Sequence, residues 1–155
     1  MEEIWGTKDG KGVFLALDWA KVFDSISPEA MTRALRRFDF PPKLVSVIGA
    51  IYENRTFVVH DNGNCSDPKT QHYGICQGCP LSPFLFIIVM TILLHDARED
   101  FENMYGPIDE TFVVRELVYA DDTILIGADG DRVEGYMASV VQAKSTMSRT
   151  KLEQN

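Results

Sequence analysis

The chain has 155 residues, 45% hydrophobic and 25% charged, a globular composition that excludes disordered and collagen-like chains. Its net charge of −8 differs from the basic footprint of most nucleic-acid-binding proteins, but residues 96–110, with six acids and one base, are interpreted as a solvated surface loop. The longest apolar run, residues 84–94, is shorter than the roughly 20 residues of a membrane helix, and no signal peptide is evident, so we expect an intracellular protein, nuclear or cytoplasmic, without a membrane partner.

The first half of the chain predicts one strand followed by two helices. The apolar run 12–18 predicts a buried strand that ends at Asp18. Ser27 as N-cap and Pro28 as first helical residue predict a helix, and a second helix is expected from Pro41-Pro42. The apolar residues expected to face the core are Met31, Ala34, Leu35 and Phe38 on the first helix and Leu44, Val47, Ile48 and Ile51 on the second.

A hairpin and a long helix are expected next. The Asn62-Gly63 pair predicts a tight turn between strands at residues 55–60 and 68–73. A glycine-containing loop at 74–80 then leads to Ser82-Pro83, which we expect to cap a buried helix that contains residues 84–94.

A second hairpin and a final helix complete the predicted elements. The apolar segments 117–120 and 123–127 flank two adjacent carboxylates, Asp121 and Asp122, at the expected hairpin tip. Residues from 131 onward place Val133, Tyr136, Met137, Val140 and Val141 on one helical face. The order of elements predicts an α+β fold with helices packed on one face of a largely antiparallel sheet, in a single domain over residues 1–155.

Three carboxylates are candidates for metal binding. Asp18 ends a predicted strand and Asp121 and Asp122 lie at a hairpin tip, so adjacent strands would bring them together. Clustered carboxylates suit hard divalent cations, which neutralise their mutual repulsion. The alternative is that Asp18 caps the following turn and that the other two lie in an ordinary solvated turn.

Three segments, LDWAKVFDSI (17–26), GICQGCPLSPFLF (74–86) and YADD (119–122), carry a family resemblance. In this order they resemble the palm motifs of reverse transcriptases, especially those of non-long-terminal-repeat retrotransposons. The resemblance covers residues 12–128 and implies a polymerase palm that joins a dNTP to a DNA primer on an RNA template. It implies two Mg²⁺ ions, with Mn²⁺ as a substitute, held by the catalytic residues Asp18, Asp121 and Asp122.

The resemblance also implies residues that bind the nucleotide and the primer. Phe23 matches the aromatic steric gate under the incoming sugar, although a core phenylalanine is the alternative. Gln77, Gly78 and Pro80 match the loop that supports the templating base and the nucleotide, and this loop is also a helix N-terminal turn. Tyr119 is expected beneath the primer end. Asp24 often accompanies this motif in the family, without an assigned role here.

Two other interpretations remain open. Cys76 and Cys79, with Cys65 and His72 nearby, are compatible with a zinc-dependent interaction module, although a second clean cysteine pair is missing. A truncated, catalytically inactive retroelement relic is the other, because the fingers and thumb segments of the family are expected to be missing and Cys76 stands where relatives carry Arg or Pro. The sequence does not indicate an oligomeric state.

Overall fold

The computed structural model describes residues 12–108, 115–119 and 122–148, which divide into two compact units. The first unit contains the described residues up to Ala20 and those of Leu93–Thr146. The second contains Lys21–Ile92 and the described residues Met147 and Ser148. Each unit is described by itself, and the prediction of a single domain stays a prediction.

The first unit is built on a three-stranded antiparallel sheet with the order β1-β7-β6. Its strands are β1 (Val13–Asp18), β6 (Arg115–Tyr119) and β7 (Asp122–Gly127). The predicted strand therefore ends at Asp18, but it is not buried as expected, since its residues are alternately half-buried and exposed. The predicted hairpin forms from β6 and β7. The central strand starts at Asp122, so this carboxylate belongs to the sheet.

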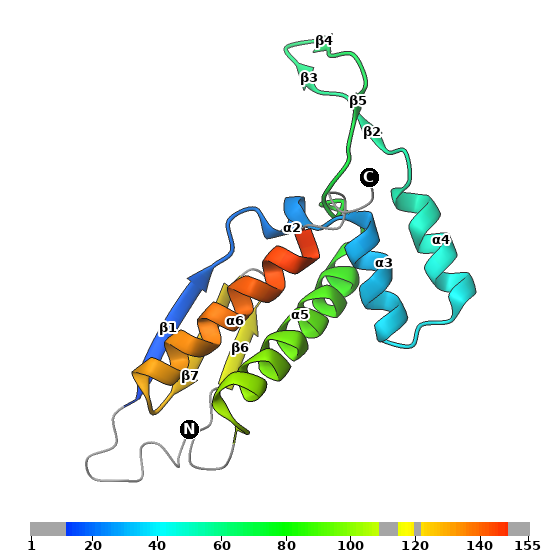
Figure 1. The fold of residues 1–155 in the computed structure, drawn as a ribbon. Helices are drawn as coiled ribbons and strands as arrows, with labels where there is room; N and C mark the ends of the chain where they lie inside the picture. Colours follow the sequence, from blue (N-terminus) through cyan, green and yellow to red (C-terminus); the bar gives the residue numbers. More distant parts are fainter. Residues whose placement is uncertain (1–11, 109–114, 120–121, 149–155) are drawn as a thin grey trace, which may run out of the picture. The chain divides into compact units, whose positions relative to one another are not determined.

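One face of this sheet is covered by helices and the other, which we call the open face, is exposed. The final helix α6 (Gly130–Ser148) lies along the covered face, together with the last turns of α5 (Ser82–Tyr105) (Figure 1). Alternate residues of a strand point to opposite faces. The alternation buries or half-buries one set of side chains on β1 and β7, and the exposed residues of the other set are Phe14, Ala16, Asp18, Asp122 and Ile124. Ile126, at the far end of β7 on the same face, is buried. The predicted α+β fold with an antiparallel sheet is confirmed.

In the second unit, three helices follow the first strand: α2 (Val22–Ser25), α3 (Pro28–Arg37) and α4 (Pro42–Tyr52). Helix α3 begins as predicted, because the Ser27 hydroxyl accepts a hydrogen bond from the Ala30 amide at 3.0 Å. The short α2 was not predicted.

The prediction of which residues of these two helices face the core is only partly confirmed. Met31, Ala34 and Leu35 are buried on α3, whereas Phe38 is exposed at its C-cap. On α4 the buried stripe is Val45, Ile48 and Tyr52; the predicted Leu44, Val47 and Ile51 are exposed. Helix α4 is apolar on more than one side, so spacing alone did not identify the face that packs in this unit.

The predicted hairpin around Asn62-Gly63 forms, but its strands are shorter than the predicted ranges 55–60 and 68–73 and are interrupted. It consists of the pairs β2 (Thr56–Phe57) with β5 (Lys69–Thr70) and β3 (His60–Asp61) with β4 (Asn64–Cys65). Asn62 and Gly63 both have positive φ, 46° and 82°, as a type I′ turn requires. Figure 1 shows this hairpin as a slender projection, and the residues of its four strands are all exposed.

Three predictions about α5 are wrong: those of its start, its burial and its end. Ser82 is the first helical residue, and its hydroxyl donates to the Cys76 carbonyl oxygen instead of capping. The helix is not buried all round, since Phe84 and Ile87 are exposed. It also runs to Tyr105, so residues 96–105 of the predicted acidic loop are helical.

The acidic part of α5 stays helical because apolar residues recur among its charges. Ala97 and Phe101, four positions apart, are both 0% exposed and anchor one stripe to the core, while the neighbouring acids Glu99, Asp100 and Glu102 are exposed. Among the described residues, no helix has the length and apolarity that crossing a membrane would require.

Candidate active site

Two of the three predicted metal-binding carboxylates are brought together on the open face. Asp18 is the last residue of β1 and pairs directly with Asp122, the first residue of β7. Both side chains are exposed. Directly opposed residues of antiparallel strands have Cβ atoms about 5 Å apart, so their side chains are close neighbours. The sheet therefore juxtaposes two residues that are distant in the sequence.

The same end of the sheet carries Tyr119, the last residue of β6. Tyr119 pairs with Asp122 on the side opposite Asp18, which makes a row of three exposed side chains across the three strands. The Tyr119 side chain is 83% exposed and is available to a ligand. The third predicted carboxylate, Asp121, and Ala120 lie outside the described residues.

A donor set of opposed carboxylates fits a divalent cation. Like charges directly across a strand pair are destabilising, and carboxylate oxygens are the preferred ligands of hard cations such as Mg²⁺. The strand register argues against the alternative role of Asp18 as a turn cap, because Asp18 is itself paired in the ladder. The direct pairing of Asp18 with Asp122 is therefore compatible with metal binding, which stays a prediction.

A buried hydrogen bond under this pair was not predicted from the sequence. The Trp19 indole Nε1 donates to the Thr123 hydroxyl oxygen at 2.8 Å. Both residues immediately follow a site carboxylate in the chain. A signal existed, since a strand alternates between faces and the neighbour of an exposed carboxylate must point inward.

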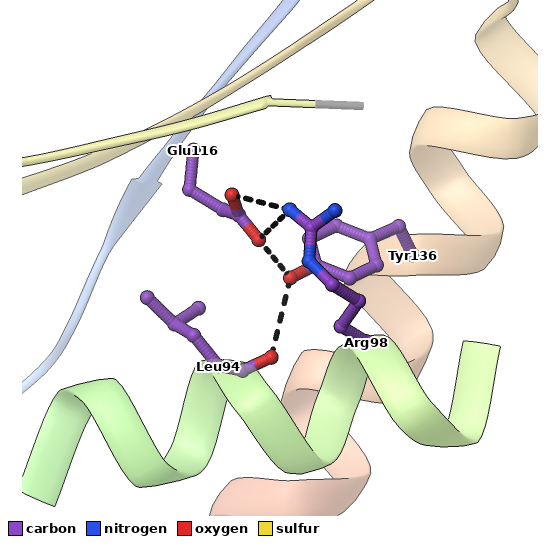
Figure 2. A network of polar contacts seen from close by, with 4 residues as sticks. All are labelled: Leu94, Arg98, Glu116 and Tyr136. Atoms are coloured by element: carbon purple, nitrogen blue, oxygen red, sulfur yellow. Dashed lines mark hydrogen bonds and ion pairs between the residues drawn. The ribbon is translucent and has the colours of Figure 1, made fainter. Parts of the chain in front are cut away.

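A polar network anchors β6 to the helices on the covered face (Figure 2). Glu116 of β6 accepts hydrogen bonds from Arg98 Nη2 at 2.7 Å to each carboxylate oxygen, and a further hydrogen bond from the Tyr136 hydroxyl. Arg98 comes from α5 and Tyr136 from α6, so one carboxylate joins three elements. The Leu94 carbonyl oxygen lies 3.5 Å from the Tyr136 hydroxyl.

The network shifts the pKa values of two of its members. Burial raises the pKa of the Tyr136 phenol, and the hydrogen bond to Glu116 and its negative charge raise it further. Burial alone would lower the pKa of Arg98, but the hydrogen bond and charge of Glu116 more than offset this and raise it. The network therefore holds Arg98 as a cation and Tyr136 as a neutral phenol.

In the second unit, Phe23 lies on α2 and stacks on Phe86 of α5. Their ring centroids are 4.1 Å apart and the planes differ by 19°. Phe86 is buried, whereas Phe23 is half-buried. This geometry accommodates both predicted roles, since one side of the Phe23 ring packs on the core and the side chain remains partly accessible.

The predicted nucleotide-binding loop is exposed at all three of its predicted residues, Gln77, Gly78 and Pro80. Gln77 Nε2 donates to Asp24 Oδ1 at 3.4 Å, which gives a structural contact to the aspartate whose role the sequence left open. Gly78 has a positive φ of 83°, a conformation that favours glycine, and the space where a Cβ would lie is open.

The zinc interpretation receives no support from the described residues. All three cysteines are free thiols. In the described ranges the one group of three converging ligand atoms is His95, Asp96 and Glu99 on the surface of α5, and it contains no cysteine. Cys65 instead contacts its cross-strand neighbour His60, with Sγ 3.0 Å from Nδ1.

Comparisons with known proteins agree with the motifs. The family described as reverse transcriptase (RNA-dependent DNA polymerase) matches residues 3–154. The chain is 33% identical, over 92% of its length, to a retrovirus-related Pol polyprotein from type-1 retrotransposable element R2 of Nasonia vitripennis, of which it covers 13%. It is 30% identical, over 70% of its length, to the Pol polyprotein from type-2 retrotransposable element R2DM of Drosophila melanogaster, of which it covers 10%.

A third relative is a transposon TX1 uncharacterized 149 kDa protein of Xenopus laevis, 29% identical over 75% of this chain and 9% of the relative. The chain thus corresponds to a small part of each of these three relatives.

Proposed function

Because the chain belongs to the reverse transcriptase (RNA-dependent DNA polymerase) family, of the non-long-terminal-repeat retrotransposon type, we propose that it is the palm core of an RNA-directed DNA polymerase. The reaction is nucleotidyl transfer from a dNTP to the 3′-hydroxyl of a DNA primer paired with an RNA template. The observation that carries this proposal is the direct pairing of Asp18 with Asp122 on an exposed sheet face.

Asp18 and Asp122, together with Asp121, are the residues proposed to hold two Mg²⁺ ions, for which Mn²⁺ can substitute. Bound divalent cations activate the attacking hydroxyl and stabilise the leaving pyrophosphate oxygen. Phosphoryl transfer needs little covalent chemistry from the protein, so the main task of these side chains is positioning. The β1-β7 ladder supplies that positioning by fixing the backbone of both aspartates.

The remaining site residues are proposed to position the substrates. Tyr119, in register with Asp122, supports the primer end. Phe23 is proposed as the gate that distinguishes a deoxyribose from a ribose, and the Phe86 ring behind it limits its movement. Gln77, Gly78 and Pro80 present exposed surface for the template base and nucleotide.

We expect the chain by itself to bind nucleic acid only weakly. The net charge is −8, and phosphate backbones are bound mainly through Lys and Arg. The parts of the longer relatives that lie outside the region of similarity are therefore the proposed source of most template and primer contacts. A relic that folds without polymerising is the competing hypothesis.

Primer extension on an RNA template with Mg²⁺ tests the proposal. The chain, a version extended at both ends by its own coding sequence, and Asp122→Asn variants of each should be compared, with Asp67→Asn on the exposed hairpin as the charge-matched control. We expect incorporation that Asp122→Asn abolishes and Asp67→Asn leaves unchanged. Equal incorporation by Asp122→Asn refutes the catalytic assignment, and no incorporation by any version favours the relic.

A further inference from the structure

A single hydrogen bond connects the two sequence neighbours of the paired aspartates. Trp19 follows Asp18, Thr123 follows Asp122, and the Trp19 Nε1–Thr123 Oγ1 distance is 2.8 Å across 104 positions of sequence. Both side chains are buried, with 6% exposure for Trp19 and 1% for Thr123. The bond therefore forms where water cannot replace it.

The register shows which part of the sheet this hydrogen bond fixes. Asp18 and Asp122 form the last pair of the β1-β7 ladder in the part of the chain that the structure describes, and Leu17 pairs with Thr123 one step inward. The Trp19 side chain reaches from just beyond the ladder back to Thr123, so the hydrogen bond passes diagonally under the aspartate pair. The carboxylates are exposed on one side of the sheet and the hydrogen bond is buried on the other.

The terminal pair of a ladder is where such a restraint has the greatest effect. Among the described residues, no further β1-β7 pair follows Asp18 to hold the strands, and two like charges directly opposite destabilise this position. A buried indole N–H and a buried hydroxyl are costly to leave without partners, so separating the strand ends carries a penalty. Lys144 Nζ of α6 lies 5.1 Å from the Trp19 ring centroid and adds a cation–π contact that orients the indole.

We propose that Trp19 and Thr123 are positioning residues, whose hydrogen bond sets the spacing and orientation of Asp18 and Asp122 for a divalent cation. This inference rests on the proposed function, because it assigns the hydrogen bond a role in metal binding by those carboxylates. Residues that orient metal ligands without touching the metal typically affect affinity by about tenfold or more.

Mn²⁺ titration of the whole chain, followed by electron paramagnetic resonance, measures this role without requiring activity. Thr123→Val keeps the side-chain shape and removes the hydroxyl, and Thr123→Ser keeps the hydroxyl. Val140→Ala, buried on α6, is the control for loss of packing alone. Affinities should be compared at a temperature at which circular dichroism shows every variant to be folded.

We expect Thr123→Val to weaken Mn²⁺ binding by about tenfold, with Thr123→Ser and Val140→Ala close to the unchanged chain. Trp19→Phe should weaken binding similarly, and combining it with Thr123→Val should add little, since both remove the same bond. Wild-type affinity in Thr123→Val, or an equal loss in Val140→Ala, overturns the positioning role. Absence of Mn²⁺ binding in the unchanged chain overturns the proposed metal site, and with it this inference.

Discussion

Asp18 and Asp122 are directly paired at the end of the β1-β7 ladder, and both side chains are exposed on the same open face of the sheet. Each would be unremarkable alone, as a strand-terminal carboxylate. Opposed to each other, they place two like charges where cross-strand contact is closest, which lowers stability. A bound cation would offset the repulsion between the two carboxylates.

The metal-free protein should therefore become more stable when one of these charges is removed. Asp122→Asn is expected to raise the free energy of unfolding by a few tenths of a kcal/mol to about 1 kcal/mol in chelator at low salt. The gain should shrink at 1 M salt because exposed charges are screened. Urea denaturation measures both values. Asp67→Asn, on the exposed hairpin, should show no comparable gain, and a less stable Asp122→Asn would contradict the electrostatic account.

Removing the positive charge of Arg98 from its network with Glu116 and Tyr136 should clearly lower the stability of the protein. In Arg98→Met, Glu116 loses both 2.7 Å hydrogen bonds and keeps a carboxylate in a largely buried place, so we expect a loss of about 1–3 kcal/mol in unfolding free energy. Lys43→Met, which also replaces a cation by methionine but at an exposed position of α4, serves as the control and should lower the unfolding free energy much less. Equal effects of Arg98→Met and Lys43→Met in thermal or urea unfolding would show that the network contributes nothing specific.

The raised pKa of Tyr136 predicts a stability loss in alkali. Tyrosine in the unfolded chain ionises near pH 10, whereas the folded protein keeps the Tyr136 proton to higher pH. The folded state then binds more protons, so this contribution is complete below about pH 10 and is lost as the pH rises above it. The difference in unfolding free energy between the unchanged chain and Tyr136→Phe should be constant from pH 7 to 9 and fall above pH 10. A difference that stays constant through pH 11 would contradict the burial of a neutral phenol.

Two glycine substitutions should have opposite signs. Gly74 has a φ of +97°, and a Cβ there would lie 3.1 Å from the Asp24 Cα, so Gly74→Ala is expected to cost about 1–3 kcal/mol. Gly49 lies inside α4 with only an ordinary 3.6 Å contact to Thr32 Cγ2, and Gly49→Ala should stabilise by about 0.5–1 kcal/mol. Thermal unfolding of both variants checks this. A stabilising Gly74→Ala would contradict the described backbone at that loop.

Local signals predicted the elements that bring the two aspartates together. The apolar run that ends at Asp18 and the hairpin pattern around Asp122 each have a local physical cause, and both elements are confirmed. The Asn62-Gly63 turn of the second unit is confirmed for the same kind of reason. The motif resemblance was needed to choose metal binding over an ordinary turn, because spacing alone does not reveal which strands are neighbours.

Features that depend on packing between elements could not be predicted in the same way. The buried face of α4 differs from the predicted stripe because the helix is apolar on several sides. The acidic residues after position 95 were assigned to a loop because their charge is conspicuous, yet Ala97 and Phe101 keep that segment helical. The Trp19–Thr123 hydrogen bond joins residues 104 positions apart, and only the register of the sheet brings them together.

Calorimetric titration with Mg²⁺ tests the central claim most directly, that Asp18 and Asp122 form a divalent metal site. The unchanged chain should bind Mg²⁺, Asp18→Asn and Asp122→Asn should each weaken binding by at least about tenfold, and Asp67→Asn should bind like the unchanged chain. If all three variants bind Mg²⁺ as the unchanged chain does, the paired aspartates are not the metal site and the account is contradicted.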